Sequence, residues 1–260
     1  MSGAKNLVVA GIDATTANKF VRRTHYSGKV DPRSQVHLGV FLNNRLEGVM
    51  QFGPSIDKNK SILLVKDTPW NGFLELNRLA FSEKLPKNSE SRAISIAIKL
   101  FKRNAPHIKW IVSYADGTQC GDGTIYRASG FHLIGIKKNN SMWRMPNGEV
   151  LCKIVLEPGF SPSKGTNNQK TRHGKTGTGT STSFLKQVGA ECLPGFQLKY
   201  IYFLDKTFEE KLTVPYLPFS EIEKQKASMY RGIGRVGVID SSPAFLAGGD
   251  GANPITRLQD

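Results

Sequence analysis

The stretch ADGTQCGDGTIYRASGF, residues 115–131, decides the fold of this chain. It overlaps the end of a nearly continuous apolar segment, HIKWIVSYAD, which is typical of a central strand that is covered on both faces. This strand ends at Asp116, and the short helix that follows ends at Gly130, because glycine readily adopts the left-handed backbone that closes a helix. The next segment, FHLIGIKK, reads as another strand. The sequence therefore predicts a strand, a polar junction, a short helix and a second strand in succession.

The segments before this stretch predict further strands and a helix. Residues 7–12 read as a first strand, and Thr15 or Thr16 can cap a helix that runs towards Gly28. Two apolar strands, VHLGVFLNN and RLEGVMQFG, meet at a pair of asparagines that begins with Asn43. Because asparagine tolerates a positive φ, this pair suits a tight hairpin turn.

The segment GFLELNRLAF (72–81) predicts a strand that carries an unusual charge. Strict alternation places Leu74, Leu76 and Arg78 on one face of this strand. An unpaired buried guanidinium is costly, so we expect an acid such as Asp116, or a phosphate, to neutralise Arg78. An amphipathic helix that packs on the sheet follows, with apolar residues at helical spacing: Ile94, Ala97, Ile98 and Phe101.

The composition favours a polyanionic partner. The 260 residues include 36 Lys and Arg against 21 Asp and Glu, which gives a formal net charge of +15. Such an excess is typical of proteins that bind nucleic acids. The three cysteines are too few and too widely spaced for a disulfide framework or a zinc knuckle, which fits a reducing compartment. No apolar run approaches the ~18 residues of a membrane span and no signal peptide is recognisable, so we expect a cytoplasmic protein.

The composition changes after Pro158. Residues 163–183 consist largely of Gly, Thr, Ser and Asn and contain no acid, which predicts a flexible basic loop. Its basic residues are Lys164, Lys170, Arg172 and Lys175. They belong either to a solvated linker or to an arm that binds DNA phosphates, and the net charge favours the arm. We expect one domain over residues 1–205 and a C-terminal extension over 206–260 that is partly a disordered tail.

The order of the predicted elements, with a short helix that reads YRASGF, resembles the fold of the acyl-CoA-dependent N-acetyltransferases, the GNAT fold. The resemblance implies an α/β (α+β) domain with a mixed central sheet, flanking helices and two central strands that splay apart. The junction at residues 115–131 would then open the catalytic cleft, since ligands in mixed α/β sheets favour strand ends.

More specifically, the chain resembles the phage Mom family of DNA adenine-modification proteins over residues 7–137. Three stretches carry this resemblance: HYSGK (25–29), FLELNRLAF (73–81) and the stretch 115–131 with Asp116 and Tyr126. The resemblance implies conversion of adenine N6 in double-stranded phage DNA to a carbamoylmethyl (acetamido) amine, which hides the DNA from host restriction. It also implies double-stranded DNA as the partner and the host cytoplasm as the location, and it leaves a homodimer open.

One segment departs from the acetyltransferase pattern. Enzymes of that fold hold the CoA pyrophosphate on a glycine-containing loop, because glycines let backbone N–H groups approach the phosphates at a helix N-terminus. The equivalent segment here, KLPKNSESRA (84–93), has no glycine, and Glu90 falls in the first turn of the helix. Lys84 can supply positive charge instead. The residues expected to bind the donor, acyl-CoA or a related compound, are Lys87, Asn88, Ser89 and Arg92.

The resemblance points to six catalytic candidates: His25, Tyr26, Ser27, Arg78, Asp116 and Tyr126. A histidine near a helix C-terminus also interacts favourably with the helix dipole, and a serine there can bond its own backbone, so structural roles stay open. The imidazole, phenol and carboxylate groups can act as acid and base. The set that could also hold iron is His25, Tyr26, Asp116 and Tyr126, although no regular histidine spacing predicts a metal unaided.

Adenine N6 is a poor nucleophile, because its lone pair is delocalised into the ring and its hydrogens are committed to base pairing. An enzyme that acts there must extrude the base into a pocket. Two other functions stay open: an N-acyltransferase that acts on a protein or small-molecule amine, and a DNA-binding protein without activity on a degenerate scaffold. The polar residues clustered at strand ends favour an enzyme.

Overall fold

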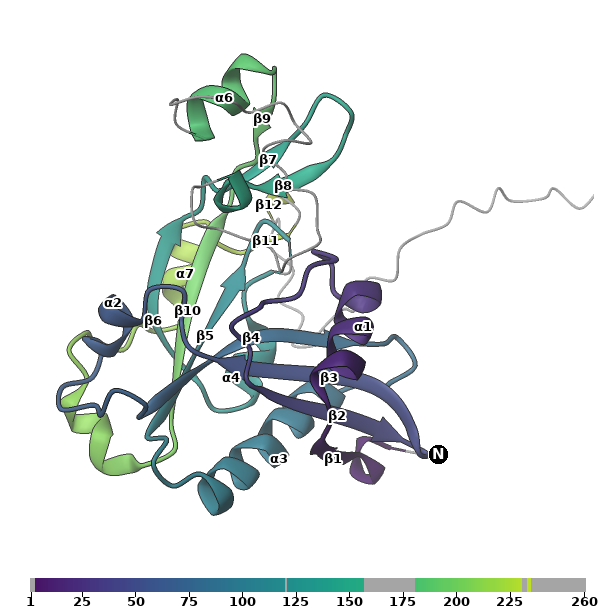
Figure 1. Cartoon of the computed structure of the whole chain (residues 1–260). Coiled ribbons are helices and arrows are strands. Elements are labelled where there is room, and N and C mark those ends of the chain that lie inside the picture. Colours follow the sequence, from purple (N-terminus) through teal and green to yellow (C-terminus); the bar gives the residue numbers. More distant parts are fainter. Residues whose placement is uncertain (1–2, 120, 157–180, 231–232, 235–260) are drawn as a thin grey trace, which may run out of the picture.

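The computed structural model describes residues 3–119, 121–156, 181–230 and 233–234. At its centre lies a seven-stranded sheet with the order β1-β2-β3-β4-β5-β10-β6 (Figure 1). The strands are β1 (Val8–Gly11), β2 (Val36–Leu42), β3 (Arg45–Gly53), β4 (Phe73–Phe81), β5 (Trp110–Asp116), β6 (His132–Lys138) and β10 (Phe196–Phe203). Neighbouring strands are antiparallel except β4 and β5, which run parallel. The sheet is therefore mixed, as predicted.

The parallel pair β4 and β5 opens along its length. Their paired positions begin at Phe73 with Trp110 and end at Glu75 with Val112. Beyond this point β4 continues to Phe81 and β5 to Asp116, and the two strands diverge (Figure 1). The predicted splaying of the central strands is confirmed, and the stretch that follows Asp116 lies at the open end.

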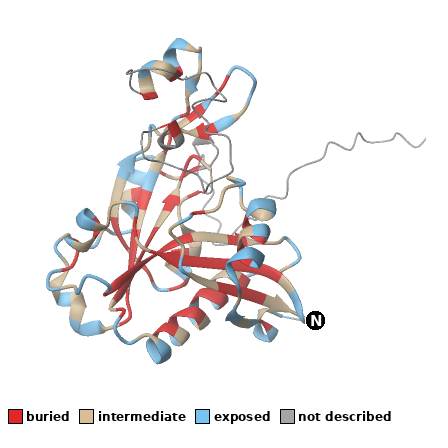
Figure 2. Cartoon of the chain, in the orientation of Figure 1, coloured by how far each residue is buried: buried red, intermediate tan, exposed pale blue. Residues whose placement is uncertain are grey.

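Helices cover both faces of the sheet. The helices in the described part of the chain are α1 (Ala14–Thr24), α2 (Lys58–Ile62), α3 (Ser89–Asn104), α4 (Thr124–Ala128), α6 (Ser181–Gln187) and α7 (Ser220–Lys224), with the 3-10 turns η1 (Ala4–Asn6), η2 (Lys153–Leu156) and η3 (Lys206–Lys211). On one face, here called the α3 face, Ile94 and Phe101 of α3 join the main core cluster. On the other, the α1 face, Phe20 of α1 packs in a cluster with Ala80 of β4. Figure 2 shows the buried residues concentrated in the sheet and on the inner sides of the helices.

A β-bulge in β4 changes the expected facing of its side chains. Phe52 of β3 pairs with Leu76 and Gln51 pairs with Arg78, so Asn77 is the extra residue. Leu76 packs on the α3 face, whereas Ala80 packs against α1. Because side chains two residues apart share a face, Arg78 also lies on the α1 face. The expectation that Arg78 shares a face with Leu76 was wrong, since simple alternation cannot register an inserted residue.

A small subdomain is inserted between β6 and β10. It contains a three-stranded sheet with the order β8-β7-β9, formed by β7 (Met142–Arg144), β8 (Val150–Cys152) and β9 (Glu191–Cys192). Trp143, Leu151 and Leu185 are buried in its own core. The predicted basic loop joins η2 to α6, but it ends earlier than residue 183, because α6 already begins at Ser181. The basic residues of the loop, Lys164, Lys170, Arg172 and Lys175, lie outside the described residues.

The chain after β10 packs against the same domain. Leu212 forms a bridge with Val65, and the backbone N–H of Leu217 donates to the carbonyl of Leu133 at 2.8 Å. Ile222 of α7 and the nearby Ala227 are fully buried in the main core. The packed region therefore extends beyond residue 205, where we expected the domain to end. Two short strands follow, β11 (Met229–Tyr230) and β12 (Ile233–Gly234). No helix in the described part of the chain is long and apolar enough to cross a membrane.

Candidate active site

His25 lies where α1 ends, and it is held as a neutral ring. The helix is capped by the preceding residue, Asp13, whose carboxylate accepts a hydrogen bond from the backbone N–H of Thr16 at 2.9 Å, so a threonine does not serve as the cap. Nδ1 of His25 lies 2.8 Å from Oγ of Ser27 and accepts from its backbone N–H at 3.2 Å. Burial, and secondly the charge of Arg78, lower the pKa of His25 to about 3. Because Nδ1 is an acceptor, the neutral ring carries its proton on Nε2 and can donate a hydrogen bond there.

Arg78 is anchored beside His25 on the α1 face. Its Nε donates to the carbonyl of Lys29 at 3.0 Å and its Nη1 donates to the carbonyl of Asn77 at 2.7 Å. The acid near Arg78 is Asp31, whose Oδ2 lies 3.9 Å from Nη1 and whose side chain is only 5% exposed. Asp31 also pairs closely with Arg33. The segment after α1 therefore brings an Arg-Asp-Arg network to the face of β4 that His25 occupies.

Asp116 is held at the end of β5, whereas the acid whose contact with Arg78 is described above is Asp31. Its Oδ1 accepts from the backbone N–H of Thr118 at 3.0 Å and from Nδ2 of Asn139 at 3.2 Å. Burial raises the pKa of Asp116, and these hydrogen bonds oppose the shift. Since Ile111 and Ala115 of β5 pack on the α3 face, alternation places Asp116 on the α1 face, at the open end of the sheet.

Glu75 and Tyr114 add a second polar group to the α1 face. Glu75 is 8% exposed, and its Oε2 has no hydrogen-bond partner among the described residues. Burial raises the pKa of this carboxyl, against the lowering effects of the Ser55 hydroxyl and of Arg33. Burial, and secondly the charge of Glu75, raise the pKa of the Tyr114 phenol. Glu75 stands at the last paired position of β4 and β5, so its carboxyl lies where the sheet opens.

The tyrosine candidates lie in different surroundings. Tyr26 is 53% exposed, and its ring centroid is 4.2 Å from that of His25. Tyr126 on α4 is buried in the main core, where its ring lies 5.6 Å from that of Phe131 and 5.4 Å from that of Tyr200. The structure thus brings Tyr26, His25, Ser27 and Arg78 together. The convergence of Asp116 and Tyr126 on the same pocket stays a prediction.

The geometry does not support the expected iron site. Among the described residues, no three His, Cys, Asp or Glu side chains gather as they would around a metal ion. Of the four side chains expected as ligands, Tyr126 packs in the core and His25 already engages Nδ1 with Ser27.

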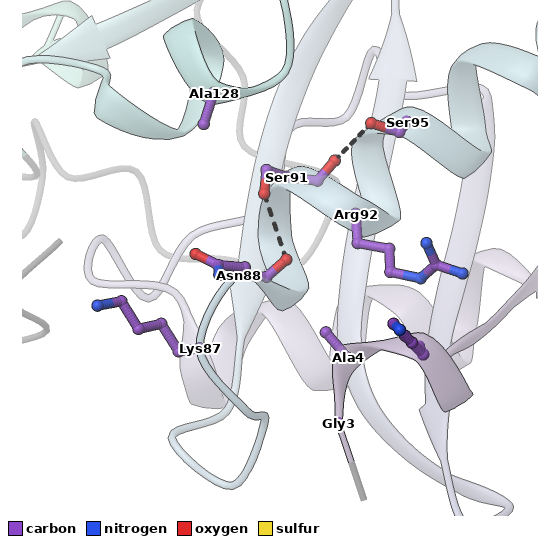
Figure 3. Close-up of a pocket in the computed structure, with 9 residues that line it drawn as sticks. Gly3, Ala4, Lys87, Asn88, Ser91, Arg92, Ser95 and Ala128 are labelled. Carbon is purple, nitrogen blue, oxygen red and sulfur yellow. Dashed lines mark hydrogen bonds between the residues drawn. The ribbon is translucent and has the colours of Figure 1, made fainter. Parts of the chain in front are cut away.

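A groove of about 440 Å³ lies at the start of α3 (Figure 3). Because α3 packs on the face of the sheet opposite α1, the groove lies on the other side of the sheet from the helix that ends at His25. The residues that line it are Gly3, Ala4, Lys5, Lys87, Asn88, Ser91, Arg92, Ser95 and Ala128. Asn88 has a φ of 69°, a left-handed backbone that glycine often supplies in such loops. Lys5, Lys87 and Arg92 give the groove positive charge, which suits a phosphate-bearing ligand.

Three of the four residues expected to bind the donor line this groove, and Ser89 does not. Ser89 is fully buried, and its hydroxyl donates to the carbonyl of Pro86 at 2.5 Å. Lys5 of η1 is a lining residue that the sequence analysis missed, because nothing local indicates that the N-terminal turn packs near α3. Asp31, Arg33, Glu75 and Tyr114 were also missed. For Glu75 a signal was present, since it is a charged residue in the same buried strand as Arg78.

The sequence of this chain matches a known protein family and a curated relative. The Mom protein family matches residues 6–221 of this chain. The methylcarbamoylase mom of Escherichia phage Mu is 40% identical over 155 residues, which make up 59% of this chain and 63% of the phage protein. The aligned region therefore spans less than two thirds of that relative.

Several solved acetyltransferases are similar in structure. An acetyltransferase from Bacillus subtilis in complex with CoA has a TM-score of 0.40 at 11% identity, and the match covers 76% of this chain and 97% of the other. A GNAT family acetyltransferase from Elizabethkingia anophelis with acetyl-CoA bound has a TM-score of 0.39 at 14% identity, with 76% and 98% covered.

Proposed function

The chain belongs to the Mom protein family, and we propose that it modifies the N6 amino group of adenine in double-stranded DNA. The observation that carries the proposal is the family match over residues 6–221, which includes the entire seven-stranded sheet. The polar groups of the α1 face fall within this range, as does the part of the groove formed by α3 and α4, whereas the groove residues Gly3, Ala4 and Lys5 precede it. The modification would protect phage DNA from restriction in the cytoplasm of the host.

The α1 face supplies groups that suit this chemistry. Adenine must leave the duplex to expose N6, and it then loses one N6 proton as the new bond forms. A carboxylate whose pKa is raised by burial is a better proton acceptor than an ordinary one, which favours Glu75 or Asp116 for this role. His25 is poorly suited to accept the proton, because its cation would form beside Arg78. Its Nε2–H can instead stabilise negative charge that develops on a carbonyl oxygen of the transferred group.

The transferred group can take two isomeric forms. The family resemblance implies a carbamoylmethyl (acetamido) group, which bonds to N6 through a methylene carbon. The phage Mu relative is named a methylcarbamoylase, and a methylcarbamoyl group bonds through its carbonyl carbon. The two products have the same mass, so they differ only in fragmentation and NMR spectra.

The donor is inferred to be acyl-CoA or a related phosphate-bearing compound. The basic groove fits the phosphates of such a donor, with Lys87, Asn88 and Arg92 as contacts and Lys5 beside them. When bound, the donor would supply the activated group and would release its own leaving group, a thiol for acyl-CoA, as the bond to N6 forms. An acyl thioester transfers its group through the carbonyl carbon, so a carbamoylmethyl product requires a related donor activated at the methylene carbon. The opening between β4 and β5 would connect the groove on one side of the sheet with His25 and Glu75 on the other. Double-stranded DNA is the proposed partner, and a homodimer is a further proposal.

The test is expression of the full chain in bacteria, followed by mass spectrometry of nucleosides from plasmid DNA. We expect a heavier deoxyadenosine, and fragmentation identifies its isomer. His25→Ala, Asp116→Ala and Tyr126→Phe should each abolish it while the variants keep a wild-type melting temperature. The matched control is His107→Ala, at an exposed position outside the site. Unmodified nucleosides from cells that contain soluble, folded wild-type protein would overturn the proposal, and acylation of a protein or small-molecule amine instead would point to a general N-acyltransferase.

A further inference from the structure

Two lysines stand beside the open end of β5, one on β10 and one on β6. Gln197 of β10 pairs with Asp116 on one side and with Lys137 of β6 on the other. Lys199 pairs with Tyr114, and its Nζ lies 5.7 Å from the centroid of the Tyr114 ring. Lys199 therefore lies on the α1 face, over the strand that ends in Asp116.

The two lysines repel each other without a compensating acid. Lys199 is half-buried and Lys137 is exposed on the neighbouring strand. Burial, and secondly the charge of Lys137, lower the pKa of Lys199. Across the described part of the chain, neither lysine forms an ion pair. Like charges on adjacent strands destabilise a sheet, so a negatively charged ligand would relieve the repulsion.

We propose that Lys199 and Lys137 bind a backbone phosphate of the DNA strand that carries the target adenine. This inference rests on the proposed function, because that function brings DNA to the α1 face. An extruded nucleotide keeps its phosphates, so a pocket for its base needs cations at the pocket edge. The Tyr114 ring beside Lys199 provides an aromatic surface next to the cation, a combination typical of sites that hold unpaired nucleotides.

The position of Lys199 separates this phosphate from those of the donor. The basic groove with Lys87 and Arg92 lies at the start of α3, and α3 packs on the opposite face. Lys199 instead shares the α1 face with Ile201, which packs with Trp110 and Val112 under the polar groups. Two sets of cations on two faces fit two different phosphate-bearing ligands, and the set beside Asp116 is assigned to DNA.

The test measures DNA binding by the full chain as a function of salt. Lys199→Gln and Lys137→Gln are compared with Lys99→Gln, which removes the same charge from the exposed side of α3. For a fluorescent duplex, the double variant should lower the slope of log affinity against log salt by ~0.9, because the two lysines share one phosphate, and each single variant by part of that amount. Lys99→Gln should leave the slope unchanged, and Lys199→Arg should retain it. Lys137→Gln keeps the test decisive if Lys199→Gln does not fold.

A second arm titrates CoA, as a probe for a donor phosphate, into the same variants. Unchanged CoA affinity with a reduced DNA slope supports the proposal. Weaker CoA binding with an unchanged DNA slope would assign the lysines to the donor, and unchanged values in both arms would make them structural; either result overturns the proposal. Because the binding arm requires no catalysis, a protein that binds DNA through these lysines but leaves adenine unmodified would refute only the proposed function.

Discussion

The neighbours of His25 determine its tautomer and its protonation state. The end of α1 places Ser27 against Nδ1, so the backbone fixes which nitrogen of the ring is free. The positive charge of Arg78 disfavours protonation of the His25 ring. Under the proposed function, a histidine in such a site would act as a neutral hydrogen-bond donor rather than as a base, and proton transfer would fall to the carboxyl groups of Glu75 and Asp116.

The lowered pKa of His25 predicts a loss of stability in acid. In the folded chain His25 stays neutral down to a pH of about 3, whereas in the unfolded chain it binds a proton near its ordinary pKa of 6.5. Between these values the unfolded state holds more protons, so the free energy of unfolding falls as the pH falls, by up to about 1.4 kcal/mol per pH unit. Urea unfolding between pH 7 and about 4 should show this extra slope in the wild type and not in His25→Asn. Identical slopes for the two proteins would contradict a His25 ring that stays neutral in the folded chain.

At the scale of single residues, the sequence alone predicted some residues of the candidate site. HYSGK pointed to His25 and Ser27, and the charge in a buried strand pointed to Arg78. The sequence could not pair Arg78 with Asp31, because 47 positions separate them and the contact depends on how the segment after α1 folds over β4. Glu75 lies in the same strand as Arg78, but the bulge that brings both to one face leaves no trace in the alternation of residues.

At the scale of elements, the junction between β5 and α4 depends on one glycine. Gly123 precedes α4 with a φ of 77°, and the Tyr200 hydroxyl donates to the carbonyl of the preceding residue. Tyr200 is fully buried, so its ring has no room to move. A Cβ atom at position 123 would lie 2.5 Å from Cε2 of Tyr200. The turn that leads from β5 into α4 therefore requires glycine for both its backbone and its contact.

Gly123→Ala should destabilise the domain more than a left-handed backbone alone explains. The left-handed conformation costs an alanine about 1 kcal/mol, and the clash with Tyr200 should add about 1 to 3 kcal/mol. Gly148→Ala is the matched control, because Gly148 has a φ of 82° and no atom within 4 Å of the added carbon. The measurement is the free energy of unfolding of both variants. Equal losses of unfolding free energy in the two variants would show that Tyr200 moves aside without cost and would contradict the prediction.

Element types were more predictable than their order in the sheet. The hairpin at Asn43 formed as expected, with φ values of 50° and 59° at the two asparagines, because the turn chemistry is local. The insertion of β10 between β5 and β6 depends on pairings such as that of Gln197 with Asp116, which no local pattern encodes. The small sheet around Trp143 likewise depends on the pairing of β7 with β9, which lie far apart in the chain.

At the scale of the whole molecule, the positive charge is divided between separate regions. Lys87 and Arg92 line the groove at α3, and Lys137 and Lys199 stand on the α1 face. The basic residues of the loop lie, in the sequence, between η2 and α6. The net charge of +15 therefore suits more than one phosphate-bearing ligand. Composition alone could predict an anionic partner, but only the fold separates the groove at α3, the proposed donor site, from Lys137 and Lys199, the proposed DNA contacts.

The basic loop gives the last prediction. If Lys164, Lys170, Arg172 and Lys175 bind DNA phosphates, replacing all four with serine should weaken binding and lower the slope of log affinity against log salt by ~0.9 for each lost contact. Substitution is preferable to deleting residues 163–183, because that deletion would remove Ser181, which is buried at the start of α6.

The variant should keep the wild-type melting temperature, since the loop sequence contains no large apolar side chain that could contribute to a core. The control is Lys99→Gln, measured on the same duplex. Combining the loop substitutions with Lys199→Gln should add their effects on the slope, because the charges would contact different phosphates. A slope that stays at the wild-type value after the four substitutions would make the loop a linker, and the DNA affinity would then have to come from the folded faces alone.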